Sequence, residues 1–177
     1  TTSTVPPPTP QPLRLAFVRG DVGNSDVYVA TADGGEPRCV ACGACDEAEP
    51  AWSPDGRFIA FFRHLASSNS WGVYIIPALG GPERRRAQIS TPLVPSLNLA
   101  WTPDSRWLVA TDENGPGQPY GLHLISIETG EKIQLTTPPR SWVVSGDSGA
   151  SFSPDRHSLA FVRSLDAGIS DIYRISL

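Results

Sequence analysis

This sequence lacks methionine altogether and contains one lysine, three histidines and no long run of apolar residues. No segment approaches the ~18 consecutive apolar residues that span a bilayer, so no membrane span is expected within the chain. Eighteen acidic and fourteen basic residues give a net charge of -4, so the basic surface typical of nucleic-acid-binding proteins is missing. Because methionine is absent even at position 1, we expect a processed product or part of a longer protein.

Proline and glycine are abundant instead, with 18 and 16 of the 177 residues. Five prolines fall within residues 1–12 (TTSTVPPPTPQP), a stretch that has a single aliphatic residue. Such a composition is typical of an extended, semi-rigid tether rather than of a packed core. We therefore expect a Pro/Thr-rich tether over 1–12 and a folded region over 13–177 that is long enough to bury a sizeable core.

One segment recurs along the folded region at nearly constant spacing. Its copies are AWSPDGRFIAFFR (51–63), AWTPDSRWLVATD (100–112) and SFSPDRHSLAFVR (151–163). A second element follows each copy, as WGVYIIPALGG (71–81), YGLHLISIETG (120–130) and SDIYRISL (170–177). The segments LRLAFVR (13–19) and SDVYVATADGG (25–35) form a partial copy. This period predicts four units, numbered one to four here, at roughly 13–45, 46–94, 95–144 and 145–177.

Each unit is predicted to consist of short β-strands. Its residues are β-branched and aromatic, its apolar positions tend to alternate, and no stretch of ten or more shows a helical period. Ser53-Pro54-Asp55-Gly56 has the composition of a tight turn between two strands. Later glycine-rich turns lead to fourth strands expected over 84–90 and 132–136. Four antiparallel strands per unit make one blade, so the sequence predicts an all-β propeller of about four blades.

The first and last blades are predicted to be incomplete. Unit one has prolines where the other units carry the inner strand, and proline cannot donate to a strand ladder. Unit four reaches Leu177 where its fourth strand should begin. Three assemblies remain open: a fragment of a larger ring, a homodimer that completes a ring, or a four-bladed ring closed by Thr1–Val5 as an edge strand.

These residues resemble the TolB-type (WD-repeat-like) β-propeller repeat, which is related to the propellers of tricorn-like and prolyl-oligopeptidase-like proteins. The resemblance rests on the A-W-S-P-D-G-x-x-I-A-F signature and the D-I-Y element, and it covers residues 13–177. It implies a propeller that binds a protein or peptide, because TolB-type propellers are chiefly binding modules. A propeller is nonetheless a scaffold on which many functions occur.

Polar residues precede the inner strand of units two, three and four. Inner strands line the central channel of a propeller, so these residues are predicted to form an oxygen-rich rim at one channel mouth. Such a rim suits a calcium ion or the basic group of a peptide. The alternative is that they are solvated loop residues and turn caps. The candidates are Asp46, Glu47, Glu49, Asn98, Asp147 and Ser148.

Three cysteines, Cys39, Cys42 and Cys45, stand close together in the sequence CVACGAC. A disulfide within the cluster with one thiol left over is the favoured interpretation, and it fits an oxidising compartment. Three free thiols, or a metal site completed by a distant ligand, remain alternatives because zinc sites made of thiolates usually need four ligands.

Arg84, Arg85 and Arg86 form a basic run on the predicted outer strand of unit two. Basic runs can mark anionic partners. The alternative is that the charges protect an edge strand against aggregation, with neighbouring side chains on opposite faces.

Three functions remain open. The favoured one is a non-catalytic, extracytoplasmic module for protein or peptide interaction or ligand sensing, without a resident cofactor. The second is the propeller part of a prolyl-oligopeptidase-like serine peptidase, whose catalytic domain this chain would lack because no G-x-S-x-G elbow occurs in it. The third is an enzyme acting at the channel mouth around calcium. The run Gly146-Asp147-Ser148-Gly149 does not indicate a serine protease, since no histidine falls where a base is needed.

Overall fold

The computed structural model describes residues 13–21, 23–68, 70–90, 98–140, 146–166 and 169–176. The predicted tether over 1–12 and the edge strand over 1–5 lie outside these ranges. Strands joined by turns and loops account for the described residues, and no helix occurs among them, which confirms the all-β prediction. In particular, the described chain has no helix of the length and apolarity that a membrane crossing requires.

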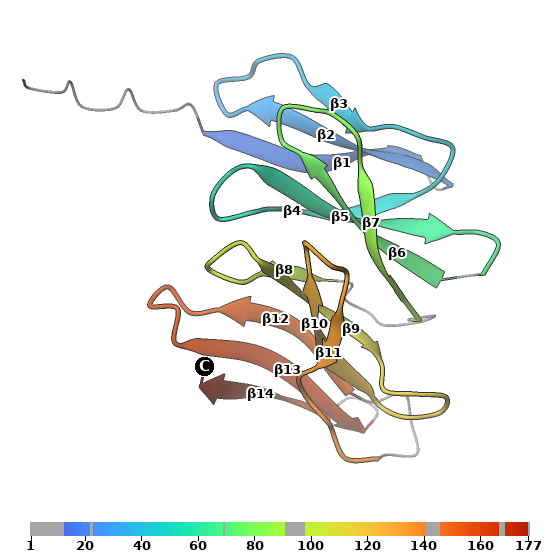
Figure 1. Cartoon of the computed structure of the whole chain (residues 1–177), viewed down its shortest axis with the longest axis vertical. Helices are drawn as coiled ribbons and strands as arrows, with labels where there is room; N and C mark the ends of the chain where they lie inside the picture. The colour runs from blue at the N-terminus through green and yellow to red at the C-terminus, as the bar shows by residue number, and fades with distance from the viewer. Residues whose placement is uncertain are drawn as a thin grey trace, which may run out of the picture.

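Within the described residues, fourteen strands form four successive antiparallel units (Figure 1). Unit one contains β1 (Arg14–Asp21), β2 (Asn24–Thr31) and β3 (Arg38–Ala41). Unit two contains β4 (Glu47–Trp52), β5 (Phe58–Leu65), β6 (Ser70–Pro77) and β7 (Arg84–Ile89). Unit three contains β8 (Leu99–Trp101), β9 (Trp107–Glu113), β10 (Tyr120–Ser126) and β11 (Lys132–Gln134). Unit four contains β12 (Gly146–Phe152), β13 (Ser158–Asp166) and β14 (Ile169–Ser176).

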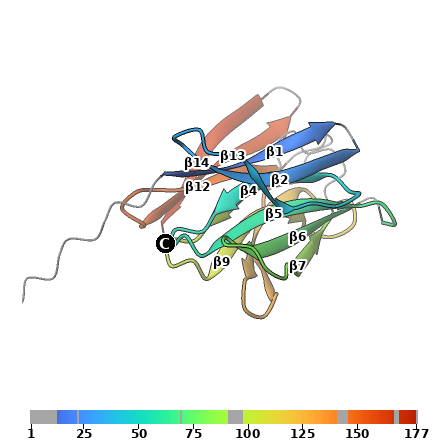
Figure 2. The ribbon, with the colours of Figure 1, turned by 90° about the horizontal axis from the view of Figure 1, so that it is seen from above.

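The units stack one after another as the blades of a propeller do. Figure 1 shows unit one at the top and unit four at the bottom, and Figure 2 shows the same stack from above. Units three and four approach closely enough to share one parallel bridge, between Tyr120 and Gly146. A Cβ atom at Gly146 would lie 2.2 Å from the carbonyl oxygen of Tyr120, so this approach requires glycine.

The predicted turn between the first two strands occurs in units two, three and four. In unit two the amide of Gly56 donates to the carbonyl of Ser53, and Gly56 has a φ of 71°. Ser105 and Arg156 adopt the same left-handed conformation at the corresponding positions, with φ of 60° and 68°. The Asp55 carboxylate accepts hydrogen bonds from the Ser53 hydroxyl (2.6 Å) and the Arg57 amide (3.0 Å). The composition of this turn thus predicted its geometry correctly.

The apolar core lies between successive units rather than within one sheet. Phe61 packs with Val27 of unit one, whereas its neighbour Phe62 packs on the opposite face with Trp101 of unit three. A third cluster joins Val109 of unit three to Phe161 of unit four. Trp101 also joins units two and three through its indole Nε1, which donates to the carbonyl of Ala51 at 2.9 Å.

Candidate functional site

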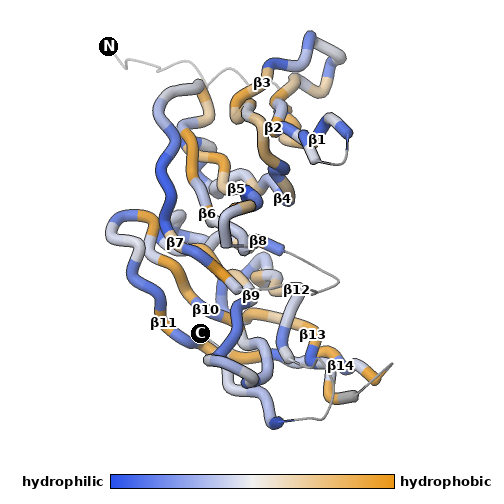
Figure 3. The backbone as a smooth tube through the Cα atoms, turned by 90° about the vertical axis from the view of Figure 1, so that its right-hand side faces the viewer, coloured by the Kyte–Doolittle hydropathy of each residue, from blue (hydrophilic) through white to orange (hydrophobic). Residues whose placement is uncertain are grey.

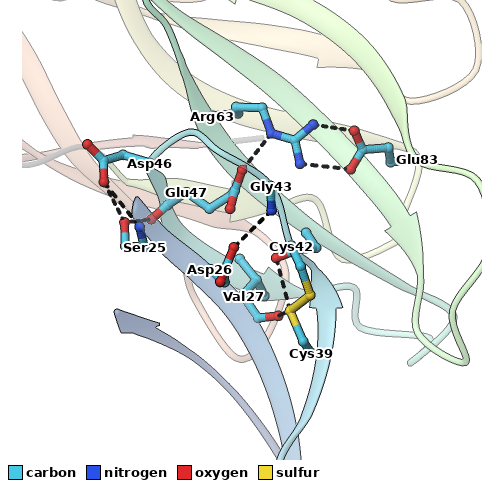
Figure 4. A network of polar contacts seen from close by, with 11 residues as sticks. Ser25, Asp26, Val27, Cys39, Cys42, Gly43, Asp46, Glu47, Arg63 and Glu83 are labelled. Atoms are coloured by element: carbon cyan, nitrogen blue, oxygen red, sulfur yellow. Dashed lines mark hydrogen bonds and ion pairs between the residues drawn. A yellow bond between two sulfur atoms is a disulfide. The ribbon is translucent and has the colours of Figure 1, made fainter. Parts of the chain in front are cut away.

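The segment 39–46, called the cysteine loop here, leads from β3 of unit one to β4, the inner strand of unit two. Cys39 and Cys42 form a disulfide, while Cys45 is a half-buried free thiol. The amide of Gly43 donates to Asp26 Oδ1 at 3.0 Å, which fastens the loop to β2 (Figure 4). The loop has this conformation because a disulfide at its start and a side-chain hydrogen bond in its middle hold it in place.

Asp46 and Ser25 fasten the other end of the loop. Asp46 Oδ1 accepts hydrogen bonds from the amides of Gly23 (2.9 Å) and Ser25 (3.2 Å). The Ser25 hydroxyl oxygen lies 3.0 Å from Asp46 Oδ1 and 3.0 Å from the carbonyl oxygen of Glu47. One carboxylate oxygen of the predicted rim residue Asp46 is therefore used to join units one and two.

Glu47, Arg63 and Glu83 form a three-member ion-pair network beside this loop (Figure 4). Glu47 Oε1 accepts from Arg63 Nε at 2.6 Å, and the two terminal nitrogens of Arg63 face both oxygens of Glu83. The side chain of Glu47 is fully buried, and its second oxygen, Oε2, has no hydrogen-bond partner among the described residues. Burial raises the pKa of Glu47, although Arg63 opposes the shift.

The arginine of this network is also held by aromatic rings. The guanidinium carbon of Arg63 lies 4.8 Å from the centre of the Tyr74 ring and 5.5 Å from that of Phe61. Although burial by itself lowers the pKa of Arg63, the hydrogen bonds with Glu83 and Glu47 raise it overall. Cation–π contact and ion pairing together hold the guanidinium in one orientation.

Unit four repeats the arrangement at the corresponding positions. The fully buried Asp147 carboxylate accepts two hydrogen bonds from Arg163, at 2.6 and 2.7 Å. Arg163 lies 4.8 Å from the centre of the Tyr173 ring, as Arg63 does from Tyr74. The repeat therefore places a buried acid of the inner strand against an arginine of the second strand.

Unit three carries the opposite charges at two of these positions. Asp112 stands where unit two has Arg63, and Lys132, which forms an ion pair with Asp112, stands where unit two has Glu83. His123 replaces the stacked tyrosine and is buried, and burial lowers its pKa. Asp112 also accepts hydrogen bonds from the amides of Ser90 (2.7 Å) and Glu113 (2.8 Å). Unit three thus has an ion pair at the same place in the blade, with the acid and the base exchanged.

A cavity of about 500 Å³ borders the cysteine loop and the ion-pair network of unit two. Its wall includes Cys42, Cys45, Arg63, Ile76 and Glu83. The charged side chains of its wall are those of Arg63 and Glu83, while the carboxylates of Asp26, Asp46 and Glu47 do not line it. The Glu83 carboxylate is the acidic group that this wall presents, and it suits a basic group of a ligand.

The six residues predicted for the rim do not all face solvent. Glu47 and Asp147 are buried in ion pairs, and Asp46 is engaged with Ser25. Glu49 is exposed, Ser148 is half-buried, and the half-buried Asn98 has an Oδ1 atom without a partner. In the described ranges no three acidic, histidine or cysteine side chains are grouped closely enough to hold a metal ion. Calcium at the channel mouth stays a prediction.

Sequence reasoning missed the arginines that organise the site. Arg19, Arg63 and Arg163 recur at the end of the F-V-R or F-F-R motif, each facing a tyrosine of the next strand. The recurrence of this arginine in the sequence repeat was the signal that could have identified these residues. Glu83 had no such signal, because it contacts Arg63 only through the pairing of three strands.

Comparison with known proteins shows that the repeat is of the TolB type. No family model matches the chain. The "Tol-Pal system protein TolB 1" of Novosphingobium aromaticivorans is 40% identical over 82 residues, which are 46% of this chain and 17% of that protein. The crystal structure of TolB from Acinetobacter baumannii superposes with a TM-score of 0.69 at 20% identity, covering 92% of this chain and 39% of that one.

A prolyl endopeptidase structure is similar in fold as well. It superposes with a TM-score of 0.71 at 15% identity and covers 96% of this chain but 27% of the endopeptidase. The chain thus corresponds to less than half of each of these proteins. At this identity the likeness to the endopeptidase concerns the propeller fold alone.

Proposed function

Because this chain carries β-propeller repeats of the TolB type, we propose that it is a non-catalytic interaction module that binds a basic segment of a protein or peptide. The binding site is the cavity beside the cysteine loop that Glu83 lines. The observation that carries the proposal is the Glu83 carboxylate, which lines the cavity beside Arg63 and is 33% exposed. A partly exposed carboxylate can accept further hydrogen bonds, so an arriving ammonium or guanidinium group would bind it.

The chemistry of the site supports binding rather than catalysis. Its charged side chains form ion pairs with one another, and Arg63 is fixed between two rings and two carboxylates. Such a network presents a rigid, charged surface, which favours selective recognition. The alternative, a propeller that covers the catalytic domain of a prolyl-oligopeptidase-like enzyme, has weaker support because that likeness is one of fold.

An extracytoplasmic location is part of the proposal. The Cys39–Cys42 disulfide supports it, because such bonds persist in oxidising compartments and are rare in the cytosol. The similarity to a protein named for the Tol-Pal system supports it as well.

The test is a screen of the chain against a library of peptides with amidated C-termini. We expect bound peptides to be enriched in arginine or lysine, and Glu83→Gln to weaken their binding about tenfold, as loss of a charge-assisted contact does. Glu36→Gln, which changes an exposed acid of unit one outside the cavity, is the matched control. No enrichment in basic residues, or equal binding by the Glu83→Gln variant, would contradict the proposal.

A further inference from the structure

A second cavity, of about 240 Å³, lies between β7 and the turn that follows β10. It adjoins the first cavity at Pro82, which lines both, but Glu83 lines only the first cavity and its neighbour Arg84 lines only this one. Its wall includes Arg84 and Arg86 of β7, the apolar residues Phe58, Ile75 and Ile127, and Glu128. β7 is the outer strand of unit two (Figure 1), so the cavity borders the outer edge of that sheet.

Two arginines of the basic run share this cavity while the third does not. Arg84 and Arg86 line it, whereas Arg85 lies over Gly72 beside the Tyr74 ring on the other face of the sheet. In Figure 3 the arginine end of β7 is drawn in the blue of hydrophilic residues. Alternation along the strand thus places two like charges next to each other, an arrangement that is unfavourable unless an anion lies nearby.

The described residues do not pair these guanidinium groups with an anion, although Glu128 lines the same cavity. Within the described ranges neither Arg84 nor Arg86 forms an ion pair, and Arg86 Nε is buried without an acceptor. Arg86 Nη1 donates to the backbone carbonyl of Glu128 at 3.2 Å, which holds the guanidinium at the cavity wall. Burial and the neighbouring charge of Arg84 lower the pKa of Arg86. An incoming acceptor gains the most binding free energy at a buried donor that has no hydrogen-bond partner.

The neighbouring interface shows that the fold does not need arginine at these positions. A related cavity of about 280 Å³ lies between units three and four, and its wall includes Trp107, Leu124 and Leu135 together with Asp104 and Arg156. By strand register Ile133 of unit three corresponds to Arg84 of unit two, and by position in the sequence repeat Leu135 corresponds to Arg86. Leu135 lines the cavity of unit three whereas Ile133 does not, so the two repeats place different side chains at these positions. Protection of an edge strand does not explain why two arginines line one cavity.

We propose that the cavity between β7 and unit three binds a carboxylate joined to a small apolar group, as at the C-terminus of a peptide. The carboxylate lies between Arg84 and Arg86, whose planar guanidinium groups match its two oxygens. The apolar group lies against Phe58, Ile75 and Ile127. The volume is below the ~300 Å³ of sites for drug-sized ligands, so the occupant is about one residue in size. Glu128 in the wall repels any anion, and it repels a dianion such as phosphate more strongly than a carboxylate.

The experiment measures binding of N-acetyl-leucine to the full chain by NMR titration, with N-acetyl-leucinamide as the matched ligand that lacks the carboxylate. We expect the acid to bind and the amide to bind at least about tenfold more weakly. 4-Methylpentanoate and a tetrapeptide ending in leucine distinguish a free carboxylic acid from a peptide C-terminus. Equal binding of acid and amide, stronger binding of inorganic phosphate, or no binding of the acid overturns the proposal.

Three variants locate the site. Arg86→Gln and Arg84→Gln are each expected to weaken binding of the acid about tenfold. Arg85→Gln removes the same charge from the same run on the opposite face and is expected to leave the affinity within about twofold, since no contact is lost. Thermal melts show whether each variant is folded, and the exposed Arg84 gives a result even where Arg86→Gln is destabilised. Equal losses in all three variants would show a general charge effect and overturn the proposal.

Discussion

At the scale of single residues, the buried acids of the inner strands are structural ion-pair partners before they are ligands. Asp147 and Glu47 occupy corresponding positions, yet their surroundings differ. Arg163 is paired with Asp147, whereas Arg63 is shared between Glu47 and Glu83. Because of this difference, removing the charge of Asp147 should lower the stability of the fold more than removing the charge of Glu47.

We expect Asp147→Asn to lower the free energy of unfolding by about 3 kcal/mol, because it leaves the mostly buried Arg163 without a carboxylate. Glu47→Gln is the matched comparison and should lower it by about 1 kcal/mol, since Arg63 keeps Glu83. Urea unfolding of both variants measures the difference. Equal losses would show that Glu83 does not compensate for the lost carboxylate.

At the scale of elements, the Ser-Pro-Asp turns carry a stabilising charge. Although burial alone would raise it, hydrogen bonds from Ser53 and Arg57 hold the pKa of Asp55 at about 2, below the ordinary 3.8. Asp104 and Asp155 also have lowered pKa values, mainly through hydrogen bonds from Thr102 and Ser153. All three turns therefore favour the ionised carboxylate.

A lowered carboxyl pKa gives stability that is full above the unfolded pKa and is lost as the pH falls through the folded pKa. For Asp55 this window runs from about pH 3.8 down to about pH 2. We expect the stability difference between the native chain and Asp55→Asn to shrink across that window in urea titrations. Ser53→Ala, which removes one of the hydrogen bonds, should show part of the effect. A difference that does not change with pH would show that the charge of Asp55 contributes nothing.

At the scale of the whole molecule, the two ends of the stack expose positions that are buried inside it. Ile172 of β14 is 83% exposed, whereas Val73, its counterpart in unit two, is fully buried. At the other end, Leu15 of β1 is 51% exposed, whereas its counterpart Ile59 is fully buried. These end faces have the residues of an interface between blades.

We expect two copies of the chain to associate through these faces, because burying such apolar surface is favourable. Light scattering should then give about twice the 19.0 kDa of one chain. Ile172→Asp should shift the mass toward that of one chain without lowering the melting temperature of the dissociated form. A mass of one chain at every concentration, for both proteins, would refute the association.

The sequence by itself determined the architecture, since the repeat, the alternation of apolar residues and the Ser-Pro-Asp turns are local signals. The 1–12 segment and the ends of units one and four remain predictions. The tertiary structure alone decided that Glu47 and Asp147 are buried, because their arginine partners lie 16 residues away and meet them only through strand register. It also decided that Arg84 and Arg86 face a cavity completed by unit three. Period and composition determine which residues alternate along a strand, whereas packing between blades determines which residues each face of the strand contacts.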